Sequence, residues 1–422
     1  MQIQYRYQDK LFDDIRDIVH NNKLKIDYDT LFTEYLPFQI FISGKTLFKG
    51  LTIEPTVRYD YTAQKPAWPS SIPERLMTFD ILFSKSMQNY LLDHGYYNHT
   101  KTAATVSGGI DSSVVALEVK PRHCYSGYYE GNGDCNETDR AKEVVSRICD
   151  SVYTPIRLTE ADFFLTNLEE YMDTVCSPVG GIGGVMELAC LKKAKAEYDM
   201  DGVLFGNGGD ELFMGYYWNH FIREFYENTD DANSLRYMRN FWPTKNRLVG
   251  KAIDYLIELS LNRWNGNYAM LGTHLFGELH TIRNPLNKLL HVNINYTLPS
   301  LLHINNQICK SVKVKGYNPL ANKDLIRMAY CFNTTRGARP KNLLRTVREN
   351  LPDSIKCSEK KLGFQIPLET WDDLNQFMHA HHHAFFKRKN VRLMVDKYAY
   401  NGITRQSWGV LMAELFLRRW DK

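Results

Sequence analysis

The sequence has few features that would tie the protein to a membrane or an oxidising compartment. Its eight cysteines are scattered, with no CxxC pair and no other metal-ligand spacing. Such usage fits reduced thiols in a cytoplasm better than a disulfide framework. No run approaches the roughly 18 apolar residues that a membrane helix needs. The N-terminal stretch, residues 1–16, also lacks the apolar core of a signal peptide. The sequence therefore predicts a cytoplasmic protein without a membrane partner.

An excess of charge of one sign is also missing. Lysine and arginine total 52 against 48 aspartates and glutamates, which gives a net charge of +4. Without a basic arm or tail, nucleic acid is not favoured as a partner. The 44% hydrophobic and 24% charged fractions are typical of a folded globular protein and exclude general disorder. At 422 residues the chain is long enough for two or three domains of about 100–200 residues each.

The pattern along the chain divides it into three parts. A stretch rich in proline and serine, residues 66–73, separates an N-terminal extension over 1–73 from a core over 74–215. In the core, helical patterns such as 74–94 alternate with short apolar runs. Strands separated by single helices pair in parallel, so an open parallel α/β sheet is predicted. Residues 216–422 read as mostly helical. The predicted strands cover 102–106, 123–129, 152–156 and 202–205.

The segment SGGIDSS, residues 107–113, follows the first predicted strand of this sheet and precedes a helix. Open α/β sheets bind ligands at that edge. Two glycines let the backbone approach a ligand, and serine hydroxyls with a helix N-terminus favour an anion such as pyrophosphate. Asp111 supplies the negative charge that magnesium needs. The structural alternative is an ordinary glycine turn with a helix cap. The residues expected to hold the anion are Ser107, Gly108, Gly109, Ser112 and Ser113.

A second glycine-rich turn, FGNGGDELFMGY over residues 205–216, ends another predicted strand. Gly206 and Gly208 indicate a tight loop with unusual backbone angles near Asp210. Asp111 and Asp210, at neighbouring strand ends, could share magnesium ions bound to a triphosphate. A single turn of this kind is as compatible with a purely structural loop. The two loops together predict a site for ATP and magnesium.

These two loops resemble those of the asparagine synthetase family, whose synthetase domain is an ATP pyrophosphatase of the SGGxDS, or PP-loop, type. Relatives include β-lactam synthetase and lasso-peptide cyclases. The resemblance implies a PP-loop fold and a two-step reaction. ATP and a carboxylate give an acyl-adenylate and pyrophosphate, and an amine then displaces AMP to form an amide. Further segments resemble the family in order: KTLFKG at 45–50, LPSLL at 298–302, PLAN at 319–322, KNLLR at 341–345 and KLGFQIPLETW at 361–371.

The resemblance also implies roles for single residues. The 107–113 loop would hold the pyrophosphate end of ATP, and Asp111 and Asp210 would be magnesium ligands. Lys361 would stabilise charge on the departing pyrophosphate, a role that suits a long cationic side chain. Its neighbour Lys360 is a rival for that role. A solvated surface charge is the alternative for each lysine.

The sequence departs from the family pattern in three respects. Asparagine-forming members begin with a glutaminase domain whose nucleophile is a cysteine exposed after removal of the initiator Met, whereas this chain has Gln2. We therefore expect no glutamine hydrolysis. Asn207 stands where the family has Glu and lactam-forming relatives have Tyr, and asparagine cannot act as a general base. Lys315 and Tyr317 stand where the family reads E-x-R. These changes predict an acid other than aspartate, with Asn207 and Lys315 as candidates for contacting the substrate.

The combined prediction is an ATP-dependent, AMP-forming amide ligase acting on a specialised carboxylic acid. A sugar uronate, a natural-product precursor or a peptide side chain would each fit. The amine would be free ammonia, ammonia from a separate glutaminase subunit, or an amine substrate. One alternative is a cyclase in which acid and amine belong to one molecule. Others are a nucleotide-binding subunit that has lost the chemistry and a tRNA-modifying relative, the latter disfavoured by the lack of a zinc-type cysteine set.

Overall fold

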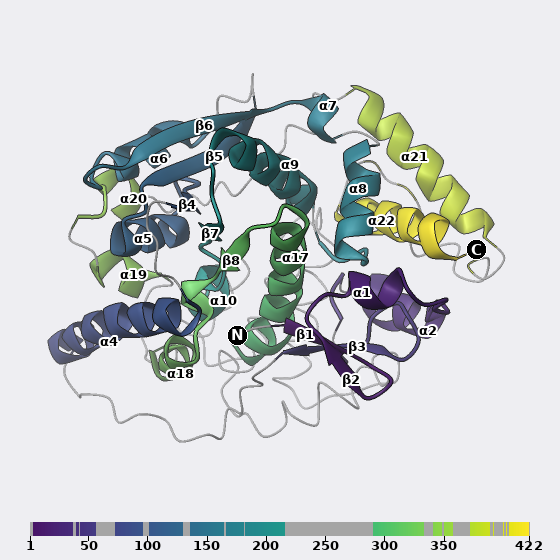
Figure 1. Cartoon of the computed structure of the whole chain (residues 1–422), viewed down its shortest axis with the longest axis horizontal. Coiled ribbons are helices and arrows are strands. Elements are labelled where there is room, and N and C mark those ends of the chain that lie inside the picture. The colour runs from purple at the N-terminus through teal and green to yellow at the C-terminus, as the bar shows by residue number, and fades with distance from the viewer. Residues whose placement is uncertain are drawn as a thin grey trace, which may run out of the picture.

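The structure is a computed structural model that describes most of the chain. Within it, two β-sheets and their helices surround one continuous cluster of buried apolar side chains (Figure 1). No helix in the part described is both long and apolar enough to cross a membrane. The described residues are 3–36, 39–41, 43–55, 72–95, 101–129, 136–163, 166–180, 182–215, 290–332, 341–347, 350–357, 372–388, 391, 400, 402 and 405–421.

The larger sheet has five strands, all parallel, in the order β6-β5-β4-β7-β8. The central strand β4 is buried over its first three residues, as expected of a strand covered on both faces by helices. This confirms the predicted α/β fold with an open parallel sheet. The strands are β4 (Thr102–Thr105), β5 (His123–Tyr129), β6 (Val152–Leu158), β7 (Gly202–Leu204) and β8 (Lys315–Tyr317).

Helices connect successive strands and flank the sheet, as Figure 1 shows for α5, α6 and α9. On α6 the buried residues Ala141, Val144 and Val145 recur at helical spacing, which is why this face packs on the sheet. The chain runs from β4 outward to β6 and then returns to β7 on the other side of β4. The carboxyl ends of β4 and β7 therefore border the switch point where open α/β sheets bind ligands. The connecting helices are α5 (Ile110–Val119), α6 (Thr138–Val145), α7 (Glu160–Phe163), α8 (Thr166–Val175) and α9 (Ile182–Glu197).

The fifth strand comes from the chain beyond residue 215. β8 pairs with β7 from Gly202 opposite Lys315 to Leu204 opposite Tyr317. The sheet thus extends past the predicted boundary at residue 215, while helices dominate the rest of the described C-terminal part. Helix α17 precedes β8 and packs against α8 and α9. The elements around β8 are the π-helical turn η5 (Asn293–Thr297), α17 (Leu298–Ser311), the 3-10 turn η6 (Pro319–Ala321) and α18 (Lys323–Phe332).

The N-terminal residues form a small antiparallel sheet in the order β2-β1-β3. The buried Tyr5 of β1 anchors this sheet to α17, because its hydroxyl lies 2.7 Å from His303 Nδ1 and accepts a hydrogen bond from Gln307 Nε2 at 2.9 Å. Phe48 packs against Phe416 near the C-terminus. The elements are β1 (Ile3–Tyr7), β2 (Lys10–Phe12), α1 (Arg16–Val19), α2 (Tyr28–Thr30), η1 (Leu31–Tyr35) and β3 (Leu51–Pro55).

The remaining helices lie around the two sheets. Helix α4 confirms the helix predicted over 74–94. Helices α21 and α22 pack against each other at the end of the molecule opposite α4 (Figure 1). Helix α19 packs on α4 and α5, and so lies close to the edge where β4 ends. These helices are α4 (Ile72–Asp93), α10 (Gly209–Leu212), α19 (Asn342–Val347), α20 (Asp353–Lys356), α21 (Asp372–Lys387) and α22 (Arg405–Trp420).

Candidate functional site

The two glycine-rich loops lie side by side at the carboxyl edge of the parallel sheet. They follow β4 and β7, which are neighbouring strands with Ala104 opposite Leu204. The first loop, residues 107–109, leads into α5, and the second, residues 206–208, leads into α10. The adjacency expected from the sequence is therefore present in the structure.

Glycines allow the second loop to press against the first. A Cβ on Gly206 would lie 2.6 Å from the Ser112 backbone nitrogen, and one on Gly209 would overlap the Asp111 carboxyl group. Gly208 has φ +102°, a conformation that L side chains rarely adopt. Its N–H donates to Glu211 Oε2 at 3.1 Å. The glycine spacing thus sets the start of α10 directly against the first turn of α5.

Serine hydroxyls hold the first loop in one shape. Ser112 Oγ accepts from the Ser107 backbone N–H at 3.1 Å and donates to the Gly109 carbonyl at 3.2 Å. Ser113 Oγ donates to the same carbonyl at 2.7 Å. Ser112 and Ser113 are buried, whereas Ser107 is exposed. Of the three serines predicted to bind the anion, Ser107 is therefore the exposed one, while Ser112 and Ser113 make hydrogen bonds within the loop, and the anion-binding role of all three stays a prediction.

The carboxylates of Asp111 and Asp210 share one cation, the ammonium group of Lys341. Its Nζ lies 2.5 Å from Asp111 Oδ2 and 2.5 Å from Asp210 Oδ1. The lysine side chain is 8% exposed and each aspartate side chain 17%. Burial alone would lower the pKa of Lys341, but the two carboxylates outweigh it and raise that pKa above its usual value. The two predicted metal ligands are thus brought together around a buried positive charge.

Lys341 is the site residue that sequence reasoning missed. It immediately precedes α19, and its backbone N–H donates to the Phe213 carbonyl at 3.1 Å. A Cβ on Gly215 would overlap both the Lys341 side chain and the Asp210 carboxylate, so this glycine leaves room for the ion pair. The signal available in the sequence was the KNLLR segment. That segment supported the family resemblance, but it lies far along the chain from either aspartate and was given no role.

The two aspartates form a donor set that fits magnesium. Mg²⁺ is usually held by one or two carboxylates together with water and the phosphate oxygens of a substrate. No group of three or more His, Cys, Asp or Glu side chains that could hold a metal is found in the described ranges. Two carboxylates beside a glycine-rich loop therefore suit a metal that arrives with a nucleotide better than a fully protein-bound ion.

Asn207 lies in the second loop and contacts the connection between β8 and η6. Its Nδ2 donates to Asn318 Oδ1 at 3.1 Å. Asn318 is buried, and its backbone N–H donates to the Tyr90 hydroxyl at 3.0 Å. Asn207, which is predicted to contact the substrate, therefore lies at the same edge of the sheet as Asp111 and Asp210, and its side chain is hydrogen-bonded to Asn318.

The structure places Lys315 differently. It stands at the beginning of β8, opposite Gly202, whereas the two glycine loops follow strand ends. Among the described residues, its Nζ donates to the His94 carbonyl oxygen and lies 5.5 Å from the centre of the Tyr317 ring. Lys361 and its rival Lys360 lie outside the described residues. The roles assigned to these three lysines stay predictions.

Comparison with known proteins identifies one family. The family model described as Asparagine synthase matches residues 98–418. That stretch contains both glycine loops, strand β8, Asn318 and Lys341. No curated protein matches the chain.

Proposed function

We propose, from the premise that the chain belongs to the asparagine synthase family, that it joins a carboxylic acid to ammonia or an amine with release of AMP and pyrophosphate. The family is one of ATP-dependent, amide-forming carbon–nitrogen ligases with ATP as co-substrate. The observation that carries the finer proposal is the pair of partly buried carboxylates around the buried Lys341, beside a glycine loop at the carboxyl edge of a parallel sheet. Such an edge suits a triphosphate whose terminal pyrophosphate must leave.

In the proposed first step, a carboxylate oxygen of the acid attacks the α-phosphorus of ATP. The bond from that phosphorus to the bridging oxygen breaks, which gives an acyl-adenylate and pyrophosphate. The backbone N–H of Gly108, the Ser107 hydroxyl and the N-terminus of α5 hold the phosphate oxygens. Magnesium held by Asp111 and Asp210 would neutralise charge on the leaving pyrophosphate.

Lys341 is proposed to act in two ways. Before nucleotide binds, its ammonium group reduces the repulsion between the two carboxylates, which are otherwise like charges in a buried place. With a metal ion held by the two carboxylates, the ammonium group of Lys341 would be available to the phosphate oxygens. A second positive charge at the leaving pyrophosphate then stabilises the transition state.

In the proposed second step, the amine nitrogen attacks the acyl carbon, the bond from that carbon to the AMP oxygen breaks, and the nitrogen loses a proton to solvent water. Asn207 can donate or accept a hydrogen bond there but cannot take that proton. Because the E-x-R positions are Lys315 and Tyr317, the proposed acid is not aspartate. A sugar uronate, a natural-product precursor and a peptide side chain are the candidate acids. The amine is ammonia, free or from a glutaminase subunit, or an amine of the substrate itself, which would make the enzyme a cyclase.

The experiment that tests this function identifies the nucleotide products. Purified protein is incubated with ATP, magnesium, ammonium and a panel of carboxylic acids, and the products are followed by phosphorus NMR. AMP and pyrophosphate that form with one class of acid would support the proposal and name the substrate class. Turnover without ammonium, on an acid that carries its own amine, would favour the cyclase. ADP and orthophosphate would refute an AMP-forming reaction.

Lys361→Ala is expected to lower turnover by on the order of a hundredfold, because removing a group that stabilises developing charge has effects of that size. Lys360→Ala is the matched control, since it removes the same charge from the adjacent position. Steady-state pyrophosphate release measures both. A hundredfold loss in Lys360→Ala with normal turnover in Lys361→Ala would transfer the role to Lys360.

A further inference from the structure

A chain of side-chain amides runs from the second loop into the protein interior. Asn207 Nδ2 donates to Asn318 Oδ1 at 3.1 Å, and Asn318 Nδ2 donates to Asn305 Oδ1 at 3.0 Å. Asn305 Nδ2 in turn donates to Glu187 Oε1 at 2.9 Å. Asn318 and Asn305 are 8% and 1% exposed. The chain therefore connects the loop after β7 with α17 and, at its inner end, with a carboxyl group on α9.

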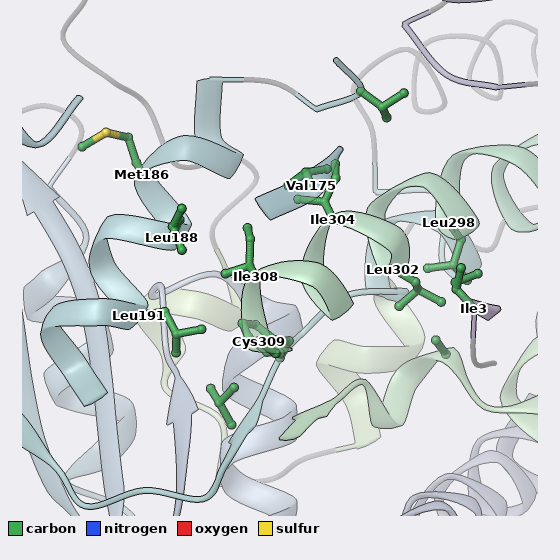
Figure 2. Packing of buried hydrophobic residues seen from close by; sticks show 14 of the residues in the cluster. Ile3, Val175, Met186, Leu188, Leu191, Leu298, Leu302, Ile304, Ile308 and Cys309 are labelled. Atoms are coloured by element: carbon green, nitrogen blue, oxygen red, sulfur yellow. The ribbon is translucent and has the colours of Figure 1, made fainter. Parts of the chain in front are cut away.

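Gly316 leaves room for this chain. A Cβ at that position would lie 2.9 Å from Cys309 Sγ and 3.3 Å from Asn305 Oδ1. The glycine in β8 thus lets α17 approach the sheet closely enough for Asn305 to reach both of its partners. Figure 2 shows buried apolar side chains on the two helices, with Leu188 and Leu191 on α9 and Ile308 and Cys309 on α17.

Glu187 has no cationic partner in the described part of the chain. Asp162 on α7 and Lys193 on α9 pair with each other at 2.7 Å. Burial raises the pKa of Glu187 to about 7, and the hydrogen bond from Asn305 offsets only part of that shift. The ionisable side chains that interact with the charge of Glu187 are Tyr125 on β5, Tyr171 on α8, Cys190 on α9 and Cys309 on α17. Burial raises the pKa of each of these four groups, so all four are neutral at pH 7.

The charge of Glu187 decides which way every amide in the chain turns. An ionised carboxylate only accepts hydrogen bonds. Asn305 must then give its NH₂ group to Glu187 and turn its oxygen to Asn318. By the same reasoning Asn318 gives its NH₂ group to Asn305, and Asn207 gives its own to Asn318. The carboxamide oxygen of Asn207 is left at the outer end of the chain, in the loop beside Asp210.

We propose that Glu187 is a positioning residue that acts through Asn305 and Asn318 to keep the Asn207 oxygen turned outward, as a hydrogen-bond acceptor for an N–H of the attacking amine. The inference rests on the proposed function, because the amine is expected near position 207. The Asn207 oxygen orients the amine nitrogen toward the acyl carbon but takes no proton from it.

Protonation of Glu187 removes this constraint. A neutral carboxyl group can donate to the Asn305 oxygen. Each carboxamide group can then rotate so that its oxygen and NH₂ group exchange places, which brings the NH₂ group of Asn207 to the outer end. That group cannot accept a hydrogen bond from an amine. Since the pKa is raised to about 7, the acceptor orientation predominates above pH 7 and is lost as the pH falls through that value.

The first test follows the amides themselves and needs no substrate. Protein labelled with ¹⁵N in asparagine is titrated by NMR, with the Asn207 side-chain signal assigned by its loss in Asn207→Ala. We expect that signal to shift with a midpoint near pH 7 in the wild type and to stay constant in Glu187→Gln. A signal that does not titrate in the wild type, or that titrates equally in Glu187→Gln, would overturn the proposal.

The second test separates the two chemical steps, using an acid that supports turnover in the panel experiment. ATP–pyrophosphate exchange reports on adenylation without amine, and amide formation is plotted against the concentration of free amine. In the wild type we expect the rate of amide formation one pH unit below the pKa of Glu187 to be roughly a tenth of its plateau value at high pH. Exchange should show no such decline. Glu187→Gln should lower the maximum rate of amide formation and remove the decrease of that rate at low pH. If the decrease at low pH is retained in Glu187→Gln, the proposal is overturned.

A matched control makes the same Glu-to-Gln change at a residue that does not belong to the row of hydrogen-bonded amides. Glu170 on α8 pairs with Lys192 at 2.6 Å, and both side chains are partly exposed. Glu170→Gln should therefore leave the pH profile unchanged. Failure of the proposed function is distinguishable from failure of this inference. If no acid supports exchange, the ligase assignment fails, whereas the NMR titration still decides whether Glu187 sets the orientation of Asn207.

Discussion

Replacing either Asp111 or Asp210 with asparagine is expected to abolish pyrophosphate release while the protein keeps its fold. Each variant loses a negatively charged group proposed as a metal ligand, and metal neutralisation of a leaving phosphate group is worth several kcal/mol in the transition state. Because each 1.4 kcal/mol is about tenfold in rate, turnover should fall by at least about 10³-fold. Pyrophosphate release measured with saturating magnesium and ATP checks this.

Thermal stability should respond in the opposite direction. Two carboxylates share one ammonium group, so the buried cluster carries excess negative charge. Asparagine at either position leaves a balanced pair, and Tm is expected to stay the same or rise. Asp199→Asn, at a position with an 86% exposed side chain, is the control and should change neither quantity. Normal turnover in Asp111→Asn or Asp210→Asn would contradict the metal assignment, and a marked fall in Tm would contradict the charge balance.

Lys341→Met is expected to destabilise the free protein strongly. Removing one partner of a buried ion pair typically costs 3–5 kcal/mol, because an uncompensated charge stays behind. Here the two carboxylates of Asp111 and Asp210 would face each other without a cation, and for a chain of this length Tm should fall by about 3–6 °C. Magnesium should restore part of this loss, because it supplies the missing positive charge between the same two groups. Thermal unfolding with and without magnesium measures both effects.

The double variant Lys341→Met with Asp210→Asn is the internal control. It leaves a single carboxylate, so most of the lost Tm should return and the response to magnesium should shrink. In the wild type, magnesium must displace the ammonium group, so its effect on Tm should be smaller than in Lys341→Met. An equal magnesium response in the wild type and in Lys341→Met would contradict the shared cation site.

Much of the fold could be predicted because its signals are local. Helix α4 and strands β5 and β6 are long enough to show their apolar periodicity, and the alternation of strand and helix dictates parallel pairing. Strand β8 could not be found in this way. It has only three residues, one of them Gly316, and it joins the sheet about a hundred residues after β7. Its place is decided by the packing of α17, a long-range contact.

In the candidate site, too, the features within one short segment could be predicted and those that depend on long-range contacts could not. The glycines and aspartates of the two loops could be predicted because each loop is contiguous and follows a strand. Lys341 could not, because its contact with Asp111 spans 230 residues. The proposed role of Glu187 could not be predicted either. Glu187 lies on a helix among apolar residues, and its role depends on a hydrogen bond to Asn305, which belongs to another helix. Chemistry carried by one loop is visible in a sequence, whereas a charge balance assembled from distant elements is not.

The most direct test of the central claim follows the oxygen atoms of the acid. The acid that supports turnover is labelled with ¹⁸O in its carboxylate and converted with ATP, magnesium and ammonium, and phosphorus NMR locates the label. If the carboxylate attacks the α-phosphorus, one labelled oxygen must appear in AMP, and pyrophosphate must carry none. Label in orthophosphate would show attack on the γ-phosphorus instead and would contradict an adenylating site built on Asp111 and Asp210.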